Sequence, residues 1–541
     1  MVLTIFAGLV AVMFVLLLPT FILAGLFAGF SLLFGKKRPQ QPVAPEPSGV
    51  YGTQGFSHTD AHLTEAGLLG HGWGEGIPVC ESLESGAVLR YCGENSLTCF
   101  GPPGAGKFTD LIARAVIECA ATRSQFIIDA SGGQIAAGTI HELRKYARVI
   151  AFSPFSEGLP PGVPELLGPS RSYNPMRTLL DPSSTAYGVQ CDGLAEIVIP
   201  DVSGKESANG GFFTGRARGA SSGVIMQLRA CGKPEEQNLA EVARIILTRR
   251  IFALAREVMK QPKASRYVKD RLGPYAAPTA ELDRTINSVL QTADEGLSFL
   301  SNEAISNVVR ISSLRFEELK HGPRPTVVIV TMPVTMLRKC RGWFGMLISS
   351  ALQELNSTPR GRWPVLMTID EFGILPRQPL VELAYAESRK RGVQLFCFLQ
   401  HTGQALEVYG ENGLKNFESG SDVLIYLPPR DLATAQAVSE RAGRGTVVVP
   451  QYSYSHDLRR GHEGELIENL GYGEHPWDVL TPQQVMSLGR NRAVMFTPGS
   501  SNAVIVGRRP WFDTTMPGHE REEHAELRRR IGADPYHRAK A

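Results

Sequence analysis

The sequence predicts an α/β fold built on a mostly parallel sheet, with a helical region inserted into it. Short apolar runs typical of buried strands recur at residues 125–130, 147–153, 326–333 and 364–375. Segments with the 3.6-residue apolar spacing of helices separate many of these runs, as crossover connections between parallel strands require. Residues 154–315 combine loops with helical spacing and show few strand signals, which indicates an inserted helical domain.

Length and composition set broad limits on the class of protein. A chain of 541 residues is long enough for two or more domains, and 43% hydrophobic with 20% charged residues is typical of globular proteins. The net charge of +3 permits nucleic-acid binding without requiring it, so a basic surface would have to be local. The eight cysteines form no C-x-x-C pair, which favours a reducing compartment and suggests no zinc site.

The N-terminus predicts a membrane anchor. Residues 1–35 carry no charged side chain and would span about 50 Å as one helix, against a hydrocarbon core of about 30 Å. Pro19 lies near the middle, so one long tilted span and a tight hairpin both remain open. A cleaved signal peptide is the competing account, but the start lacks basic residues and the apolar run is too long. Lys36, Lys37 and Arg38 follow, which places the rest of the chain in the cytoplasm.

The remaining chain divides into segments by composition and pattern. A proline-rich linker at 36–50 is expected to act as a semi-rigid spacer. The α/β region is expected in two parts, 51–175 and 319–516, around an inserted all-α domain at 176–318. Helical spacing within the insertion covers residues 211–231, 239–260 and 282–301. The charged residues 517–541 predict a flexible tail.

A glycine-rich segment between a predicted strand and a predicted helix is the strongest chemical signal. Its sequence GPPGAGKFT follows the apolar run 97–100 and precedes the helical pattern 111–121. Strand, glycine-rich turn and helix form the context of a phosphate-binding loop, in which backbone N–H groups surround an anion and a lysine reaches the β- and γ-phosphates. The residues expected to surround the phosphates are Gly101, Pro102, Pro103, Gly104, Ala105, Gly106, Lys107, Phe108 and Thr109.

The loop departs from the common pattern at one position, and a simpler interpretation exists. Phe108 stands where a serine or threonine hydroxyl would bind Mg²⁺, and Thr109 is one residue out of register. A glycine-rich turn with a surface lysine is the alternative to a nucleotide site.

The strand pattern 365–369 ends in Asp370 and Glu371. A carboxylate at this end of a parallel strand would lie beside bound phosphates, so we expect Asp370 to hold Mg²⁺ and Glu371 to orient or activate the attacking water. A solvated pair of acids at a strand end is the alternative, and the phosphate loop upstream disfavours it.

Two further residues are candidates for the same chemistry. Gln400 ends the next predicted strand at the same edge of the sheet and is expected to contact the γ-phosphate or the water; its alternative role is a loop cap. Arg389 precedes that strand, and we expect it to act across a subunit boundary on transition-state charge, although it could be part of an exposed basic turn.

Together these motifs resemble the membrane-anchored coupling proteins of type IV secretion and conjugation, the TraG/TraD-like ATPases. The likeness runs from Gly52 to Trp511 with matching order and spacing. The segments that carry it are GTQGFSHTDAHLTEAGLL at 52–69, GPPGAGK at 101–107, SYNPM at 172–176, FFTGRARG at 212–219, IDEFGILP at 369–376, FLQHTGQALEVYG at 398–410 and DLATAQAVSERAGRGT at 431–446.

The resemblance implies a RecA-like P-loop NTPase domain with an inserted all-α domain and an N-terminal transmembrane anchor. It implies a homo-hexameric ring at the bacterial inner membrane that uses ATP and Mg²⁺. The ring would pass single-stranded DNA bound to a relaxase, or protein substrates, to the components of a secretion channel. Lys107, Asp370, Glu371, Arg389 and Gln400 fall on nucleotide-site positions of the family.

Two departures from the family leave other functions open. The strand after the phosphate loop usually carries D-x-K-G, whereas residues 129–132 read DASG, and the residue after Lys107 is phenylalanine. Both favour the alternative of a docking receptor that binds nucleotide but scarcely hydrolyses it. A DNA pump for chromosome segregation shares the ATPase core, but residues 517–541 are too few for a DNA-reading domain.

Overall fold

The structure is a computed structural model that describes residues 44–55, 59–200, 208–277, 280–456, 466–498, 500 and 502–509. The predicted anchor at 1–35, most of the predicted linker and the predicted tail at 517–541 lie outside these residues. Within the described ranges, no helix combines the length and the apolar character that crossing a bilayer requires.

A large sheet forms the centre of the α/β region. Its strands are β1 Ile77–Glu81, β2 Val88–Tyr91, β3 Ser96–Phe100, β4 Ser124–Asp129, β5 Arg148–Phe152, β6 Thr326–Thr331, β7 Val365–Ile369, β8 Val393–Leu399, β9 Ser421–Tyr426, β12 Arg492–Phe496 and β13 Val504–Gly507. The eleven strands lie in the order β2-β1-β13-β12-β9-β3-β8-β7-β4-β6-β5. In this order, each pair of neighbours from β9 to β5 is parallel. Each pair from β2 to β12 is antiparallel, and so is the pair formed by β12 and β9. The predicted α/β class is therefore confirmed.

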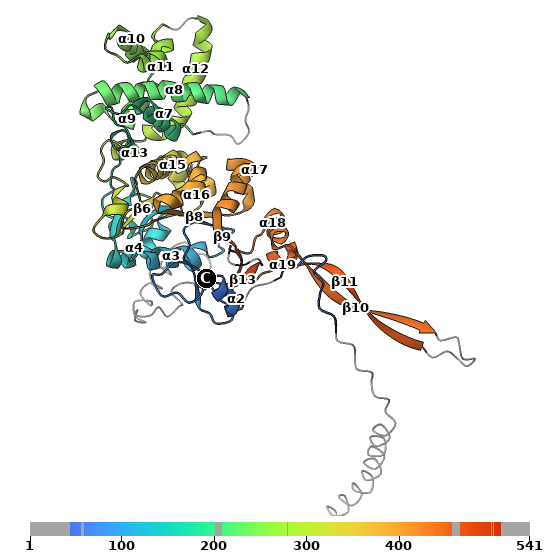
Figure 1. Cartoon of the computed structure of the whole chain (residues 1–541). Coiled ribbons are helices and arrows are strands. Elements are labelled where there is room, and N and C mark those ends of the chain that lie inside the picture. The colour runs from blue at the N-terminus through green and yellow to red at the C-terminus, as the bar shows by residue number, and fades with distance from the viewer. Residues whose placement is uncertain are drawn as a thin grey trace, which may run out of the picture. The chain divides into compact units, whose positions relative to one another are not determined.

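Both faces of the parallel strands are buried, which explains why they read as continuous apolar runs. All six residues of β4 are buried. Phe126 and Ile128 pack into the core on one face, and Ile127 packs into the core on the other. Two sets of helices cover these faces, and Figure 1 shows them on either side of the strands. They are α3 Ala113–Cys119 and α4 Gln134–Tyr146 on one face, and α15 Val334–Ser357, α16 Pro379–Glu387 and α17 Thr402–Gly420 on the other.

Between β5 and β6, every regular element in the described residues is a helix. Figure 1 shows α8 to α12 set apart from the sheet, with α15 and α16 between. The helices of this region are α5 Val163–Leu167, α6 Pro175–Thr178, α7 Tyr187–Val198, α8 Ala208–Cys231, α9 Leu239–Leu247, α10 Ile251–Lys260, α11 Arg266–Ala276, α12 Ala280–Leu297, α13 Glu303–Val308 and α14 Glu318–His321, together with the 3₁₀ turns η2 Pro234–Glu236 and η3 Ser298–Ser301.

The predicted helical run 239–260 is broken in the structure into α9 and α10. Arg249 lies between them with φ 61°, a left-handed conformation that ends α9. Its guanidinium donates two hydrogen bonds, of 2.8 and 2.7 Å, to the carboxylate of Asp294 on α12. The residue at the break therefore forms an ion pair with another helix, and apolar spacing in the sequence does not predict such a contact.

Two further strands, β10 Arg444–His456 and β11 Leu466–Asp478, pair with each other as a separate hairpin. The described residues between Thr446 and Pro476 and residues 44–50 belong to a compact unit of their own. Within that unit, the backbone N–H and hydroxyl of Ser48 donate hydrogen bonds of 2.6 and 2.5 Å to the carboxylate of Glu474. The sequence patterns had not predicted this hairpin.

Candidate active site

The glycine-rich loop connects the end of β3 to a helical segment. Gly104 and Gly106 have φ of 73° and 92°, which L residues rarely adopt. A Cβ on Gly106 would lie 2.5 Å from the carboxylate of Asp110, so the turn requires glycine there. The next residues form a π-helical turn, Lys107–Ile112, that leads directly into α3. Loop and helix start together present backbone N–H groups suited to an anion.

Lys107 is a buried residue rather than a surface lysine, with 7% of its surface exposed. Its Nζ donates a hydrogen bond of 2.9 Å to the carbonyl oxygen of Gly101 and lies 3.1 Å from a carboxylate oxygen of Glu371. The ammonium group therefore joins the glycine-rich loop to the end of β7. An ammonium has three N–H donors, so one remains for a phosphate oxygen.

Asp370 and Glu371 follow β7, which is separated from β3 by β8. The Asp370 carboxyl is buried, and burial raises its pKa; the neighbouring charges of Glu371 and Asp129 add to this rise, and Lys107 opposes it. Glu371 has φ 50° and ψ 43°, a left-handed conformation that costs about 1–3 kcal/mol in a non-glycine residue. Such strain in a carboxylate beside a phosphate loop is typical of a functional position.

Gln400 follows β8, the strand between β3 and β7. Its side-chain amide donates a hydrogen bond of 2.7 Å to Glu371 Oε2, whereas the Lys107 ammonium lies 3.1 Å from Oε1 of the same carboxylate. Its backbone N–H donates to the side chain of Gln404 on α17 at 2.9 Å. Lys107, Glu371 and Gln400, which lie far apart in the sequence, are thus connected at one edge of the sheet.

The two departures noted in the sequence have structural explanations. The Phe108 ring is buried and lies against Gly138 of α4, where an added Cβ would be 2.5 Å from the ring. The Thr109 hydroxyl donates to Asp110 at 2.6 Å and lies 3.3 Å from the Gly106 carbonyl oxygen. Ser131 stands at the lysine position of D-x-K-G and donates to Asp129 at 2.7 Å. Phe108 and Ser131 therefore serve packing and local hydrogen bonding.

Arg389 is the predicted site residue that the structure does not bring near the loop. It belongs to the turn Ser388–Arg391 that precedes β8, whereas Gln400 follows β8. The seven residues of β8 separate the two ends by roughly 20 Å. The Arg389 side chain is exposed and donates to Asn95 at 3.3 Å. It lies at the edge of the sheet opposite to the loop of its own chain.

Sequence reasoning missed Arg508, which directly follows β13 and is 2% exposed. Its guanidinium donates hydrogen bonds of 2.8 Å to the Ala105 carbonyl and to the Asp110 carboxylate. It also donates to the Arg492 carbonyl at 3.2 Å and to the Arg490 carbonyl. This arginine holds the glycine-rich loop from the side of the antiparallel strands. The only sequence signal was a basic pair after an apolar strand.

The residues present fit a magnesium nucleotide. The buried Asp370 carboxylate lies among other acids, and a divalent cation would relieve the cost of its ionisation. The loop offers glycines where a side chain would intrude, together with a buried lysine. In the described residues, no group of three histidine, cysteine, aspartate or glutamate side chains is arranged to hold a metal. Phosphate oxygens and water would therefore complete the coordination of Mg²⁺.

The parallel sheet, the glycine-rich loop before a helix and the acidic strand end define the phosphate-loop class of nucleotide-binding proteins. A family model described as type IV secretory system conjugative DNA transfer matches residues 80–532. The chain therefore belongs to this family, which confirms the resemblance found in the sequence.

Individual relatives agree with the family. The type IV secretion system-coupling protein VirD4 of Bartonella quintana is 24% identical over 351 residues, which are 63% of this chain and 53% of the relative. The conjugal transfer protein TraG of Agrobacterium fabrum is 26% identical over 328 residues, 59% of this chain and 48% of the relative. The chain thus matches about half the length of these relatives.

Solved structures of the plasmid coupling protein TrwB share the fold. An unbound form, TrwBdeltaN70, has a TM-score of 0.62 at 14% identity, and the match covers 85% of this chain and 93% of the solved TrwBdeltaN70 chain. TrwB in complex with ADP and Mg²⁺ has a TM-score of 0.60 at 14% identity, with 86% and 95% covered. TrwB has also been solved with an ATP analogue.

Proposed function

We propose that this chain is an ATP-hydrolysing coupling protein of a type IV secretion or conjugation system at the bacterial inner membrane. It recruits single-stranded DNA bound to a relaxase, or protein substrates, and drives them to the secretion channel. The connection of Lys107, Glu371 and Gln400 at one edge of the sheet carries this proposal. Family membership and the names of the relatives support the coupling role.

ATP and Mg²⁺ are the proposed cofactors, and TrwB with ADP and Mg²⁺ or with an ATP analogue supports them. Residues 101–109 surround the phosphates, with the backbone N–H groups of the residues other than Pro102 and Pro103 as donors, and Lys107 neutralises the phosphate charge. Asp370 holds the metal, which offsets the charge of the phosphates. Glu371 accepts a proton from the attacking water, and its bonds to Lys107 and Gln400 fix its orientation.

Arg389 is proposed to complete the site of a neighbouring subunit in a homo-hexameric ring. In a head-to-tail ring, each subunit presents one face to the opposite face of the next. The position of Arg389 at the edge opposite to the loop of its own chain, with an exposed side chain, supports this role. An arginine supplied in this way stabilises charge in the transition state of phosphoryl transfer.

The proposed organisation follows the sequence. A transmembrane anchor at 1–35 and a linker at 36–50 precede a RecA-like domain in two parts, 51–175 and 319–516, around an all-α domain at 176–318 and before a tail at 517–541. The soluble part faces the cytoplasm. The helices between β5 and β6 support the placement of the all-α domain.

A docking receptor with little hydrolysis is the second candidate. Phe108 and Ser131 favour it, because the first offers no hydroxyl to Mg²⁺ and the second replaces the family's lysine. Such a receptor would bind nucleotide to change shape and recruit substrates without a motor cycle.

Phosphate release by the full 541-residue chain in detergent separates the two candidates. The motor proposal expects Lys107→Ala to abolish ATP-dependent release and nucleotide binding. It expects Glu371→Gln to lower release by about 10²–10⁴-fold with binding retained. Lys415→Ala, a change at an exposed lysine on α17, is the matched control. Equal release by the wild type and Lys107→Ala would refute the motor and leave the receptor.

A further inference from the structure

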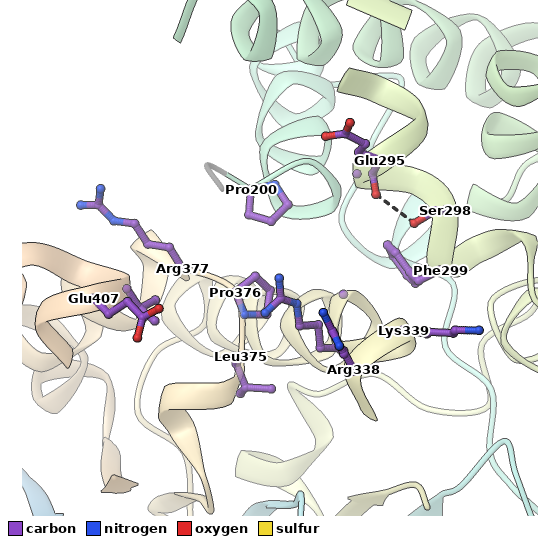
Figure 2. A pocket seen from close by; sticks show the side chains of 14 residues that line it. Pro200, Glu295, Ser298, Phe299, Arg338, Lys339, Leu375, Pro376, Arg377 and Glu407 are labelled. Carbon is purple, nitrogen blue, oxygen red and sulfur yellow. Dashed lines mark hydrogen bonds between the residues drawn. The ribbon is translucent and has the colours of Figure 1, made fainter. Parts of the chain in front are cut away.

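A cavity of about 610 Å³ lies between the inserted helices and the α/β region. Figure 2 shows Pro200, Glu295 and Phe299 on the side of the inserted helices, and Leu375, Pro376 and Arg377 on the opposite side. The remaining walls come from the first turns of α15 and from Glu407 and Val408 of α17. Its size falls within the range of about 300–1,000 Å³ typical of ligand sites.

The charges of this cavity favour an anion. Four lining residues are basic and two are acidic, which leaves a local net charge of +2 in a chain whose total is +3. Three of the basic residues, Arg338, Lys339 and Arg341, are exposed on one short stretch of α15. Among the described residues, none of these three has an acidic partner, whereas Arg377 pairs with Glu382 at 3.0 Å.

Apolar groups line the cavity beside these charges. Pro200, Phe299, Leu375, Pro376 and Val408 contribute to its walls. Single-stranded nucleic acid combines a phosphate backbone with flat apolar bases, and its binding sites pair basic side chains with apolar or aromatic surface. A small anion would require only the basic side chains for binding and would leave the apolar walls without a contact. The combination therefore favours a polynucleotide strand.

The cavity is connected to the proposed active site through two short segments of chain. Glu371 begins the turn Phe372–Ile374, and Leu375–Arg377 follow directly as a cavity wall. Gln400 precedes α17, which supplies Glu407 and Val408 to another wall. Glu371 and Gln400 are hydrogen-bonded to each other, so this bond joins the starts of the two segments that lead to these walls.

We propose that this cavity binds the phosphate backbone of single-stranded DNA and that the Glu371–Gln400 pair transmits the state of the nucleotide to it. This inference rests on the proposed function and adds to it a DNA-contact site within each subunit. Arg338 and Arg341, one helical turn apart on α15, are the main phosphate contacts, and the apolar walls accept the bases.

The test is the fluorescence anisotropy of a labelled single-stranded oligothymidine added to the full chain. Arg338→Gln/Arg341→Gln is expected to raise the Kd by about tenfold or more and to reduce the slope of log K against log salt by about 1.4, or 0.7 for each lost phosphate contact. Arg256→Gln/Arg266→Gln on α10 and α11 removes the same charge from exposed positions outside the cavity. This control is expected to bind as the wild type does.

A variant that binds DNA more tightly than the wild type gives further evidence, because misfolding would weaken DNA binding. Glu295→Gln removes an exposed acid from the cavity wall and is expected to tighten DNA binding severalfold. Unchanged Kd and salt slope in the arginine variant, or an equal loss in the control, would overturn the inference. Loss of binding to a protein substrate with DNA affinity unchanged would also overturn it and assign the cavity to protein cargo.

Failure of the proposed function gives a different result. If the chain binds DNA through the cavity but releases no phosphate from ATP, the motor proposal is refuted and the DNA site is retained. If the chain hydrolyses ATP but its DNA affinity is unchanged when the cavity arginines are substituted, the motor proposal is retained and the DNA site is refuted.

Discussion

The side-chain amide of Gln400 donates a hydrogen bond of 2.7 Å to Glu371, whose other carboxylate oxygen lies 3.1 Å from Lys107 Nζ. Two residues from separate segments, Lys107 and Gln400, thus contact the one carboxylate of Glu371. Because Glu371 is held in a left-handed conformation, its position depends on these partners as well as on its backbone. The arrangement makes Gln400 a positioning residue for the proposed water-activating carboxylate.

Loss of the Gln400 amide should impair turnover more than binding. We expect Gln400→Ala to reduce phosphate release by about tenfold to a hundredfold, because small misplacements of a reacting group have effects of this size. Nucleotide affinity should stay near that of the wild type, since the loop and Lys107 are unchanged. Steady-state release and binding of a fluorescent ATP analogue measure the two effects. Gln291→Ala, at an exposed position of α12, is the control, and an equal loss in both variants would contradict this role.

The raised pKa of Asp370 predicts a pH-dependent affinity for Mg²⁺. Burial, followed by the charge of Glu371, lifts the pKa of this carboxyl above its usual value, so the protonated form persists to higher pH. A metal requires the ionised form, and its affinity should therefore rise as the pH increases from about 5 to 8. Titration of Mg²⁺ against nucleotide binding measures this dependence. Asp370→Asn should weaken metal binding and remove the dependence; an unchanged pH profile in that variant would assign the titration to another group.

The position of Arg389 predicts complementation between two inactive variants. Lys107→Ala and Arg389→Ala should each lack activity as pure proteins. Mixed rings should regain part of the wild-type rate, because an Arg389→Ala subunit supplies an intact loop and a Lys107→Ala neighbour supplies the arginine. Phosphate release after mixing and reassembly is the measurement. Lys390→Ala, the adjacent exposed residue, should behave as the wild type, and an absence of recovery in the mixture would contradict action across the subunit boundary.

The contact of Phe108 with Gly138 predicts an unusual stability effect. Replacing a helical glycine by alanine normally stabilises a protein by about 0.5–1 kcal/mol. At Gly138 the new Cβ would lie 2.5 Å from the buried Phe108 ring, so we expect Gly138→Ala to lower the free energy of unfolding by about 1–3 kcal/mol.

Chemical denaturation of Gly138→Ala, Phe108→Leu and the double variant measures this coupling. The free energy of unfolding of the double variant should exceed, by about 1 kcal/mol, the value expected from adding the two single changes. Additive changes would show that the ring and the helix do not share this space.

Local patterns predicted most of the sheet because its strands are buried on both faces and its loop has a characteristic composition. The runs at 125–130 and 326–333, for example, correspond to β4 and β6. Tertiary features were less accessible. The start of α15 at Val334 is one example, because its first turns are largely exposed and show little apolar spacing. The role of Phe108 depends on Gly138, thirty residues later in the chain, and the break at Arg249 accompanies its pairing with Asp294.

The buried pair of Arg508 and Asp110 was also invisible to local patterns, since almost four hundred residues separate its members. Burial raises the pKa of Asp110, and Arg508 opposes that rise. Arg508→Met would leave this carboxylate buried without its cation and would free the Ala105 carbonyl. We expect the free energy of unfolding to fall by about 3–5 kcal/mol and nucleotide affinity to weaken, because the loop loses its anchor.

A double variant tests whether Arg508 shapes the phosphate loop or only stabilises the fold. Asp110→Asn/Arg508→Met removes both charges and should recover much of the stability, since an uncompensated buried charge causes most of the loss. Nucleotide affinity should stay reduced in this double variant, because Ala105 still lacks its donor. Denaturation midpoints and nucleotide titration together measure both effects. If affinity recovered along with stability, Arg508 would be a partner of Asp110 alone, without a role in the shape of the phosphate loop.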